Sequence, residues 1–289
     1  MATLAQARVG EALASARDAF AAVGIEDPRL DAELLLAEAT GQDRAALIAS
    51  PGAELAPAAS RSFGEMVRRR LRREPVAYIL GRRWFREIEL AVDRRVLIPR
   101  PETELLVEIA LERAPATLLD LGTGSGAIAL AAAAELPDCA VTAADTSPGA
   151  LEVARANAAR LGLADRVEIL PGSLPEGRSF DLVLANLPYV AERDWPSLQP
   201  EVTQWEPREA LLAGADGLDA YRQLLEGGRL LCRLAAQTST TLAVEVGEGQ
   251  AGAVAELMGA AGCVGIETRP DLAGIERVVL GSIPAAGAG

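Results

Sequence analysis

The spacing of apolar and polar positions changes character along the chain. Over residues 1–75, apolar side chains recur every three or four positions, which predicts a small domain of amphipathic helices. The expected helices cover residues 4–24, 27–41 and 57–75. Asp27 is placed to cap the second of these helices, and Pro28 to occupy its first turn.

From residue 115 onward, short apolar strands alternate with helical runs. The expected strands are Thr117–Gly122, Ala140–Asp145, Arg166–Leu170, Phe180–Asn186 and Thr240–Gly247. The helical runs between them are 127–136, 148–162 and 250–262. Such alternation indicates an α/β fold with a mainly parallel sheet covered by helices on both faces. Residues 265–281 predict two further strands joined by a short connection, as in an antiparallel hairpin.

The stretch between these two patterns reads as a β-hairpin linker over residues 76–100. Residues 84–90 and 94–99 are the expected strands, with the turn at Val92-Asp93. The remaining residues, 101–289, are expected to form one larger domain.

The composition excludes several classes of protein. Half of the 289 residues are hydrophobic, which supports a substantial core. No apolar stretch reaches the ~18 residues of a membrane span, and the first residues lack the pattern of a signal peptide. We therefore expect a cytoplasmic protein with no membrane partner.

The chain contains no histidine and no lysine, so all 28 of its cationic side chains are arginines. This excludes imidazole bases, Ser-His triads and lysine Schiff bases. The cysteines Cys139, Cys232 and Cys263 form no CxxC pair and are expected to be buried thiols, and we expect no metal site. Catalysis would have to use Asp, Glu, Asn, Tyr, Ser, backbone groups or a cofactor.

The charge is unevenly distributed. The net charge of −13 disfavours general binding to nucleic acid or anionic membranes. Between Arg61 and Arg100, however, twelve arginines face five acids, with the run RRRLRR at 68–73 in the centre. Either a solvated helix face or a docking surface for a macromolecule would explain this local excess.

A glycine loop follows the first strand of the larger domain. Gly122, Gly124 and Gly126 separate the strand from an apolar helix, and Asp145 ends the next strand. Glycines there let the backbone approach a ligand, and an acid at the second strand end can bind ribose hydroxyls. The three alternate glycines favour S-adenosylmethionine (AdoMet), while a dinucleotide or a purely structural turn remain alternatives.

The fourth strand of this domain ends in Asn186, Leu187, Pro188 and Tyr189. In an open α/β sheet it would lie beside the first strand, so this tetrapeptide would face the glycine loop. An asparagine oxygen and a backbone carbonyl can accept the N–H groups of a substrate amide or amine, and the tyrosine ring can pack on a planar group. A simple strand-ending turn is the alternative.

These motifs resemble those of a known enzyme family. The loop Asp120–Gly126, Asp145 and the tetrapeptide Asn186–Tyr189 are similar to amino-group methyltransferases with an (N/D)PPY signature. The segment Ile98–Glu108, with the sequence PRPETE, resembles the protein-(glutamine-N5) methyltransferases of release factors, known as PrmC or HemK. Further similar segments are Arg73–Phe85, Trp205–Tyr221 and Asp271–Gly281.

The resemblance implies a seven-stranded, mainly parallel Rossmann-like methyltransferase sheet. It implies methyl transfer from AdoMet to the glutamine amide nitrogen of a Gly-Gly-Gln motif in peptide chain release factors. The catalytic residues would be Asn186 and Tyr189. The cofactor would contact Asp120, Gly122, Thr123, Gly124, Ser125, Gly126, Asp145, Leu174 and Asn186. The substrate would contact Arg100, Glu102, Asn186, Leu187, Pro188 and Tyr189.

Two positions depart from the family pattern. Leu187 stands where the family usually has a proline, although its backbone carbonyl can still accept a hydrogen bond. Ser173 and Leu174 stand where the family tends to carry an acidic-aromatic pair beside the adenine. For Arg100 and Glu102, an exposed ion pair in a linker competes with a role at the site.

The resemblance also implies that the helical domain and the basic hairpin hold the release factor, with the enzyme a monomer that does not act on nucleic acid. The alternatives are an adenine methyltransferase acting on DNA or RNA, an NAD-dependent oxidoreductase, and a silent AdoMet-binding module. Acidity disfavours the first, and the lack of histidine and lysine disfavours the second.

Overall fold

A computed structural model describes residues 7–175, 178–225 and 239–285. Its contacts divide the chain into a helical unit and an α/β unit. The helical unit comprises Met1–Gly81 with Pro200–Trp205, and the α/β unit comprises Arg82–Gln199 with Glu206–Gly289. The domain bounds expected from the sequence remain a prediction.

The apolar runs of the α/β unit form a seven-stranded sheet in the order β5-β4-β3-β6-β7-β9-β8. Its strands are β3 Thr117–Leu121, β4 Ala140–Asp145, β5 Val167–Pro171, β6 Leu182–Ala185, β7 Thr240–Glu245, β8 Val264–Pro270 and β9 Glu276–Ile283. The strands from β5 to β7 are parallel, whereas β9 is antiparallel to both β7 and β8. The five predicted strands and the final antiparallel hairpin are therefore confirmed, as is the pairing of β6 with β3.

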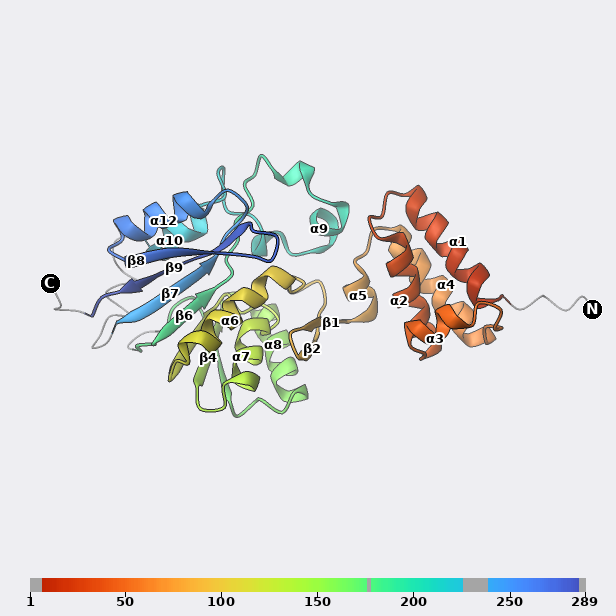
Figure 1. Ribbon diagram of the computed structural model, residues 1–289, viewed down its shortest axis with the longest axis horizontal. Helices are drawn as coiled ribbons and strands as arrows, with labels where there is room; N and C mark the ends of the chain where they lie inside the picture. Colours follow the sequence, from red (N-terminus) through yellow and green to blue (C-terminus); the bar gives the residue numbers. More distant parts are fainter. Residues whose placement is uncertain (1–6, 176–177, 226–238, 286–289) are drawn as a thin grey trace, which may run out of the picture. The chain divides into compact units, whose positions relative to one another are not determined.

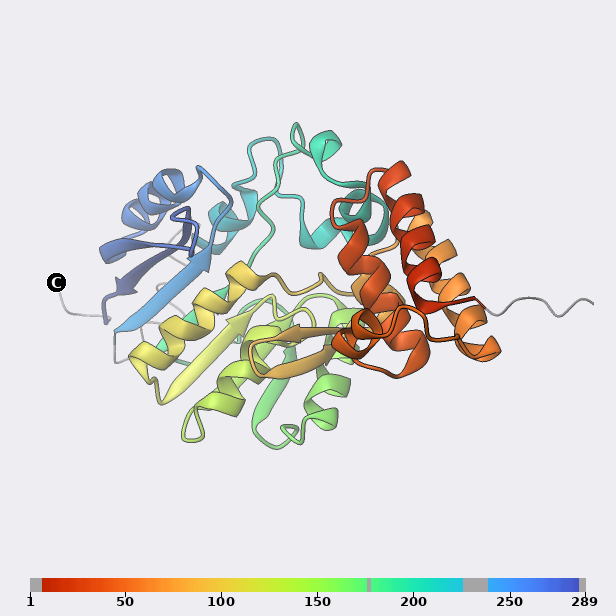
Figure 2. The ribbon, with the colours of Figure 1, turned by 45° about the vertical axis from the view of Figure 1, so that its right-hand side comes forward.

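Helices cover both faces of this sheet (Figures 1 and 2). On one face lie α6 Glu104–Arg113, α7 Ala127–Glu135 and α8 Pro148–Arg160, and on the other α10 Asp219–Leu225 and α12 Ala251–Ala260. Short 3-10 helices are η1 Pro101–Thr103, η2 Trp195–Ser197 and η3 Arg208–Ala210. Fully buried apolar residues of β3, β6 and β7 form the core between the layers, so the strand ends are held rigidly.

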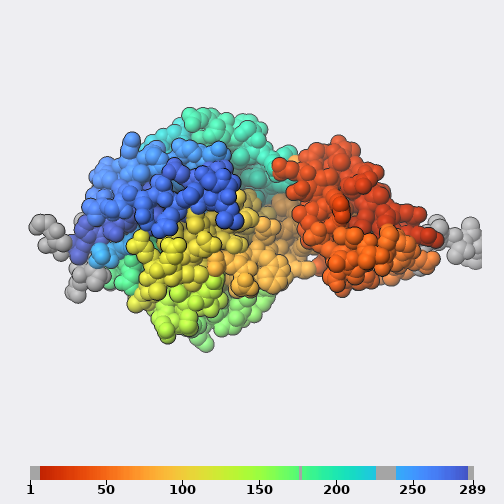
Figure 3. All heavy atoms as spheres, viewed as in Figure 1, coloured from red at the N-terminus to blue at the C-terminus, as the bar shows by residue number. Residues whose placement is uncertain are grey.

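The helical unit forms a separate core. Its helices are α1 Val9–Ala22, α2 Pro28–Thr40, α3 Arg44–Ala49, α4 Pro57–Leu71, α5 Val76–Leu80 and α9 Pro200–Trp205. Phe20, Leu35 and Leu36 are completely buried within it, and Figure 3 shows the outer surface of this part of the chain in red and orange. Pro28 takes the first helical position as predicted, whereas the Asp27 side chain makes no capping hydrogen bond.

The linker hairpin differs from its prediction in the position of its turn and in its second strand. The linker hairpin pairs β1 Arg82–Phe85 with β2 Ile88–Ala91, so its turn lies at Arg86-Glu87 and residues 94–99 form no strand. The strands are closer together in the sequence than expected, because Phe85 and Ile88 pair directly across a two-residue connection.

The arginine run at 68–73 is only in part a solvated face. Arg70 is 6 % exposed and bonds Asp31 of α2 and Glu201 of α9, both at 2.7 Å. Arg73 binds the same Glu201 at 2.6 Å. These ion pairs attach α9 to the helical unit, although α9 lies about 130 positions after Arg73 in the sequence.

Three further findings bear on the exclusions drawn from composition. Within residues 7–175, 178–225 and 239–285, no helix is both long and apolar enough to span a bilayer, and no cluster of His, Cys, Asp or Glu could hold a metal ion. Cys139 and Cys263 are buried free thiols, as predicted. Cys232 lies outside the described residues.

Candidate functional site

The glycine loop connects β3 to α7 through three left-handed residues. Gly122, Gly124 and Gly126 have φ values of 76°, 57° and 85°, a region in which side chains other than glycine are strained. At Gly126 a Cβ would also lie 2.8 Å from Leu130 Cδ1. The backbone N–H groups of Gly122 and Thr123 both donate to the carbonyl of Ala144 on β4, which holds the loop against the neighbouring strand.

Asp120 is a completely buried acid at the end of β3. Its Oδ2 accepts hydrogen bonds from Thr123 Oγ1 at 2.5 Å and from Ala129 N at 3.0 Å. Its Oδ1 is buried and has no hydrogen-bond partner among the described residues. Burial raises the pKa of Asp120 to about 7, against the lowering effect of these two hydrogen bonds. An open acceptor beside a glycine loop suits a bound cationic or hydroxyl group.

Asp145 ends the adjacent strand β4, and its carboxylate bridges two backbone segments. One oxygen accepts from Gly124 N at 2.9 Å, and the other from Ser147 N at 2.8 Å. The acid expected to bind ribose therefore lies directly against the glycine loop, as the strand order requires.

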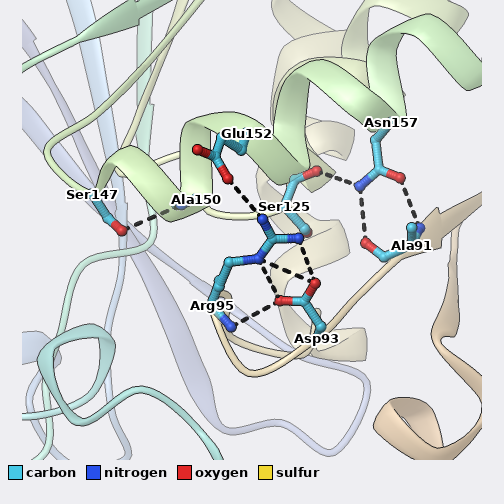
Figure 4. Close-up of polar contacts among 8 residues, drawn as sticks. All are labelled: Ala91, Asp93, Arg95, Ser125, Ser147, Ala150, Glu152 and Asn157. Atoms are coloured by element: carbon cyan, nitrogen blue, oxygen red, sulfur yellow. Dashed lines mark hydrogen bonds and ion pairs between the residues drawn. The ribbon is translucent and has the colours of Figure 1, made fainter.

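A third side chain supports the loop from behind. Asn157 of α8 is completely buried, and its Nδ2 donates to the carbonyls of Ser125 at 2.9 Å and Ala91 at 3.0 Å. Its Oδ1 accepts from Ala91 N at 2.7 Å, so one amide ties the glycine loop to strand β2 (Figure 4). The helical pattern at 148–162 gave this residue no special place. The available signal for Asn157 was an amide side chain among the alanines of a helix, because a buried amide needs hydrogen-bond partners.

The tetrapeptide at the end of β6 lies beside the glycine loop. Leu121 of β3 pairs with Ala185 of β6, which places Gly122 opposite Asn186. A Cβ added to Gly122 would lie 3.7 Å from the Asn186 carbonyl oxygen and 3.5 Å from Leu187 Cδ2. The Asn186 side chain donates through Nδ2 to Thr103 Oγ1 at 2.9 Å.

Tyr189 packs against the core with its ring beside Gly247, and its carbonyl accepts from Gln250 Nε2 at 2.9 Å. Burial, with the nearby charge of Glu245, raises the pKa of Tyr189 to about 12. The phenol is therefore neutral at physiological pH and can serve as a flat wall, but not as a base.

Arg100 and Glu102 come from the loop and 3-10 helix that precede α6. Their charges act on the pKa of the Tyr189 phenol in opposite directions, so both lie near the tetrapeptide. Arg100 Nη2 binds Glu206 Oε1 at 2.6 Å, and the other oxygen of Glu206 accepts from Ile98 N at 3.0 Å. Among the described ion pairs, Arg100 thus has the buried Glu206 as its partner and not Glu102.

The remaining expected contacts lie after β5. Leu174 is half-buried and packs against the sheet core, and Ser173 is exposed. Both follow the carboxyl end of a strand that is two positions from β3 in the sheet. They share an edge of the sheet with the glycine loop, and no described contact joins them to it.

Two site residues were missed from the sequence. Thr103 is 4 % exposed, and its Oγ1 accepts a hydrogen bond from Asn186 Nδ2. Glu245, which ends β7, is 2 % exposed, and its Oε2 has no hydrogen-bond partner among the described residues. An acid closing an otherwise apolar strand pattern, TTLAVE, was the available signal.

The chain matches two family models. Residues 11–81 match the PrmC N-terminal domain, and residues 118–205 match a methyltransferase domain. The first match lies in the helical unit, and the second covers the strands that carry the glycine loop and the tetrapeptide.

Curated relatives extend the similarity to the full length. The chain is 42% identical over 283 residues to the release factor glutamine methyltransferase of Cereibacter sphaeroides, covering 96% of this chain and 100% of that one. It is 44% identical over 278 residues to the protein of the same name from Moorella thermoacetica, covering 93% and 96%. Among solved structures, the hMettl16 catalytic domain in complex with the MAT2A 3′UTR hairpin 6 shares the fold at 15% identity, with a TM-score of 0.54 over 67% of this chain and 76% of that one.

Proposed function

We propose a function from one premise: this chain belongs to the release factor glutamine methyltransferase family. It is an enzyme that transfers a methyl group from AdoMet to the side-chain amide nitrogen of the glutamine in the Gly-Gly-Gln motif of a peptide chain release factor. The observation that carries this function is the 42% identity to a relative of that name over that relative's entire length.

The residues at the ends of β3 and β4 fit the cofactor. The buried open acceptor of Asp120 suits the methionine ammonium group, and Asp145 suits the ribose hydroxyls. Gly122, Gly124 and Gly126 would lie along the nucleoside, together with Thr123, Ser125 and Leu174. When bound, AdoMet supplies an already activated methyl group on its sulfonium.

The tetrapeptide fits a planar amide. An amide nitrogen is a poor nucleophile because its lone pair is delocalised, so orientation is the main task of the protein. Asn186 Oδ1 and the Leu187 carbonyl would accept hydrogen bonds from the two N–H groups of the glutamine side chain. These hydrogen bonds would stabilise the positive charge that develops on the nitrogen. Pro188 stiffens the loop, and the neutral ring of Tyr189 packs against the amide plane.

The release factor would be held by the rest of the chain. The PrmC N-terminal domain match covers residues 11–81, which include the basic run at 68–73. We assign this unit and the hairpin β1-β2 to the release factor, and Arg100 with Glu102 to the substrate loop that carries the glutamine. The enzyme would act as a monomer in the cytoplasm, on a protein and not on nucleic acid.

The test is a transfer assay with methyl-labelled AdoMet. The purified chain is incubated with a release factor, with the same factor in which the Gly-Gly-Gln glutamine is replaced by alanine, and with duplex DNA. Label should appear only in the unaltered release factor. Label in DNA alone would establish the adenine methyltransferase alternative, and AdoMet binding without transfer to any substrate would establish a silent binding module.

A further inference from the structure

The turn between β7 and α12 carries a glutamine to which the function described above gives no role. Gln250 comes directly before α12 and is half-buried. Its Oε1 accepts a hydrogen bond from Gly247 N at 3.0 Å, while its Nε2 donates to the carbonyl oxygens of Tyr189 at 2.9 Å and of Gly217 at 3.4 Å. One side chain thus joins the turn after β7, the end of the tetrapeptide and the loop before α10.

The chemistry of these partners allows one orientation of the Gln250 amide. A backbone N–H only donates, so it must meet the amide oxygen, whereas the two carbonyls only accept and must meet the NH2 group. The NH2 group has two N–H bonds, one for each carbonyl. The backbone of the turn is closed as well, because Gln250 N donates to the Gly247 carbonyl at 3.1 Å. The side chain is therefore fixed at both ends.

The segments around Gln250 approach so closely that they require glycine at two buried positions. A Cβ added to Gly217 would lie 2.4 Å from the Tyr189 carbonyl oxygen and 2.7 Å from Gln250 Nε2. A Cβ added to Gly247 would lie 2.8 Å from Gln250 Oε1 and 3.1 Å from Tyr189 Cδ2. The backbone and the ring of Tyr189 are therefore in close contact with the same two segments that hold the glutamine.

The peptide group that follows Tyr189 is held on both sides. Its oxygen accepts from Gln250 Nε2, and its N–H, which belongs to Val190, donates to the Leu211 carbonyl at 2.8 Å. Within residues 7–175, 178–225 and 239–285, the Tyr189 hydroxyl has no hydrogen-bond partner. The position of the phenol ring therefore depends on this peptide group and on packing.

We propose that Gln250 is a positioning residue for Tyr189: its amide fixes the peptide group after Tyr189 and thereby the place of the ring that packs on the substrate amide. This inference rests on the proposed function, because the place of the ring matters only where a planar substrate group lies against it. Without the glutamine, the carbonyls of Tyr189 and Gly217 lose their shared donor, and the ring moves with its backbone.

The kinetic test uses Gln250→Leu in the full-length enzyme, which removes the amide and keeps much of the side-chain volume. This variant should lower kcat for release factor methylation by about tenfold, with the Kd for AdoMet changed less than about threefold. Glu256→Gln, an exposed change on α12, is the matched control and should keep the wild-type kcat. The proposal is overturned if Gln250→Leu keeps the wild-type kcat, or if its AdoMet affinity falls as much as its kcat.

A second variant, Gln250→Glu, distinguishes positioning from packing by its pH profile. A protonated carboxyl has one donor and one acceptor, so it can replace the bonds to Tyr189 and Gly247, whereas an ionised carboxylate repels the carbonyls. The ratio of its kcat to that of the wild type should rise about threefold or more between about pH 9 and about pH 5, as the introduced carboxyl binds a proton. The same ratio for Gln250→Leu should stay constant. A ratio for Gln250→Glu that does not change with pH contradicts the proposal.

The spectroscopic test needs no substrate. The chain has three tyrosines, so fluorotyrosine labelling gives three 19F signals, and Tyr189→Phe identifies that of Tyr189. In Gln250→Leu the Tyr189 signal should shift or broaden, while that of Tyr78 in the helical unit stays in place. A Tyr189 signal that matches the wild type would refute the positioning role. Because this readout uses the protein alone, it stands even if no release factor is methylated, an outcome that would refute the proposed function instead.

Discussion

The buried acids of the two units differ in their partners. In the helical unit each is held by arginine: Glu33 by Arg29 and Arg44, and Asp31 and Glu201 by Arg70. In the α/β unit, Asp120 and Glu245 are at least as buried, and each keeps one oxygen without a partner among the described residues.

The pKa values of Glu33 and Glu201 follow this difference, whereas burial raises the pKa of Asp31 despite its hydrogen bond to Arg70. Burial alone would raise the pKa of Glu33, but hydrogen bonds from its two arginines outweigh it and the net shift is downward. For Asp120 and Glu245, burial dominates and raises the pKa to about 7. A satisfied acid contributes to structure, whereas an unsatisfied acid at the carboxyl end of a strand is reserved for a ligand or for positioning one. Glu206 is the exception in the α/β unit, because Arg100 holds it.

The largest effect is expected from breaking the satisfied network. Arg70→Met leaves Asp31 and Glu201 in a buried site without their shared cation, and should lower the free energy of unfolding by about 3–5 kcal/mol. Denaturant unfolding, with amide exchange of α2 and α4 as a local probe, measures it. A loss well below this range would mean that the network is solvated and that the contrast between the units is false.

Removing an unsatisfied acid should have the opposite sign. The pKa of Asp120 is raised in the folded state, so between about pH 4 and 7 the folded protein holds a proton that the unfolded chain has lost, and stability falls as pH rises. Asp120→Asn should therefore be more stable than the wild type at pH 8, by up to a few kcal/mol at ~1.4 kcal/mol per pKa unit, and this gain should vanish at pH 4.

The same Asp120→Asn variant separates stability from binding. Since the lost charge would face the methionine ammonium, its affinity for AdoMet should fall by about tenfold, a loss of ~1.4 kcal/mol. Calorimetric titration at pH 8 measures this affinity. A variant that is less stable than the wild type at pH 8 would show that Asp120 is structural.

A smaller effect is expected where the buried polar group is neutral and fully bonded. Asn157→Ala removes three hydrogen bonds between the glycine loop and β2, and should cost about 1–3 kcal/mol of stability. AdoMet affinity should also fall, because the loop loses its support. Glu152→Ala on the same helix removes an exposed partner of Arg95 and is the matched control, for which no change is expected.

The smallest effect should come from the exposed end of the arginine run. Arg68 pairs with Glu65 one turn earlier on α4, and both side chains are more than half exposed. Solvent screens such pairs, so Arg68→Gln should leave the unfolding curve unchanged within error. If it instead weakens the interaction with a release factor in a binding titration, the docking assignment of this surface gains support.

The strand assignments succeeded because the signal was local. Thr117–Leu121 and Ala140–Asp145 are runs long enough to identify buried parallel strands, and the glycines after the first mark its turn. The hairpin turn was placed wrongly because residues 94–99 resemble a strand in composition, while pairing depends on which residues face each other. The helices α3, α5, α6, α9 and α10 were not predicted; all of them except α6 have only five to seven residues, too few to carry a clear periodicity.

What the sequence determined by itself was the order of elements and the motifs at their ends, including Asp120, the glycine loop, Asp145 and the tetrapeptide from Asn186. These follow from periodicity and from residue chemistry at fixed spacing. Only the tertiary structure decided that Thr103 and Glu245 join Asn186, and that Glu201 belongs with Arg70. The reason is physical: a hydrogen bond or an ion pair depends on the distance between atoms, and strand register and helix packing bring together residues that lie from 59 (Asn186 and Glu245) to 131 (Arg70 and Glu201) positions apart.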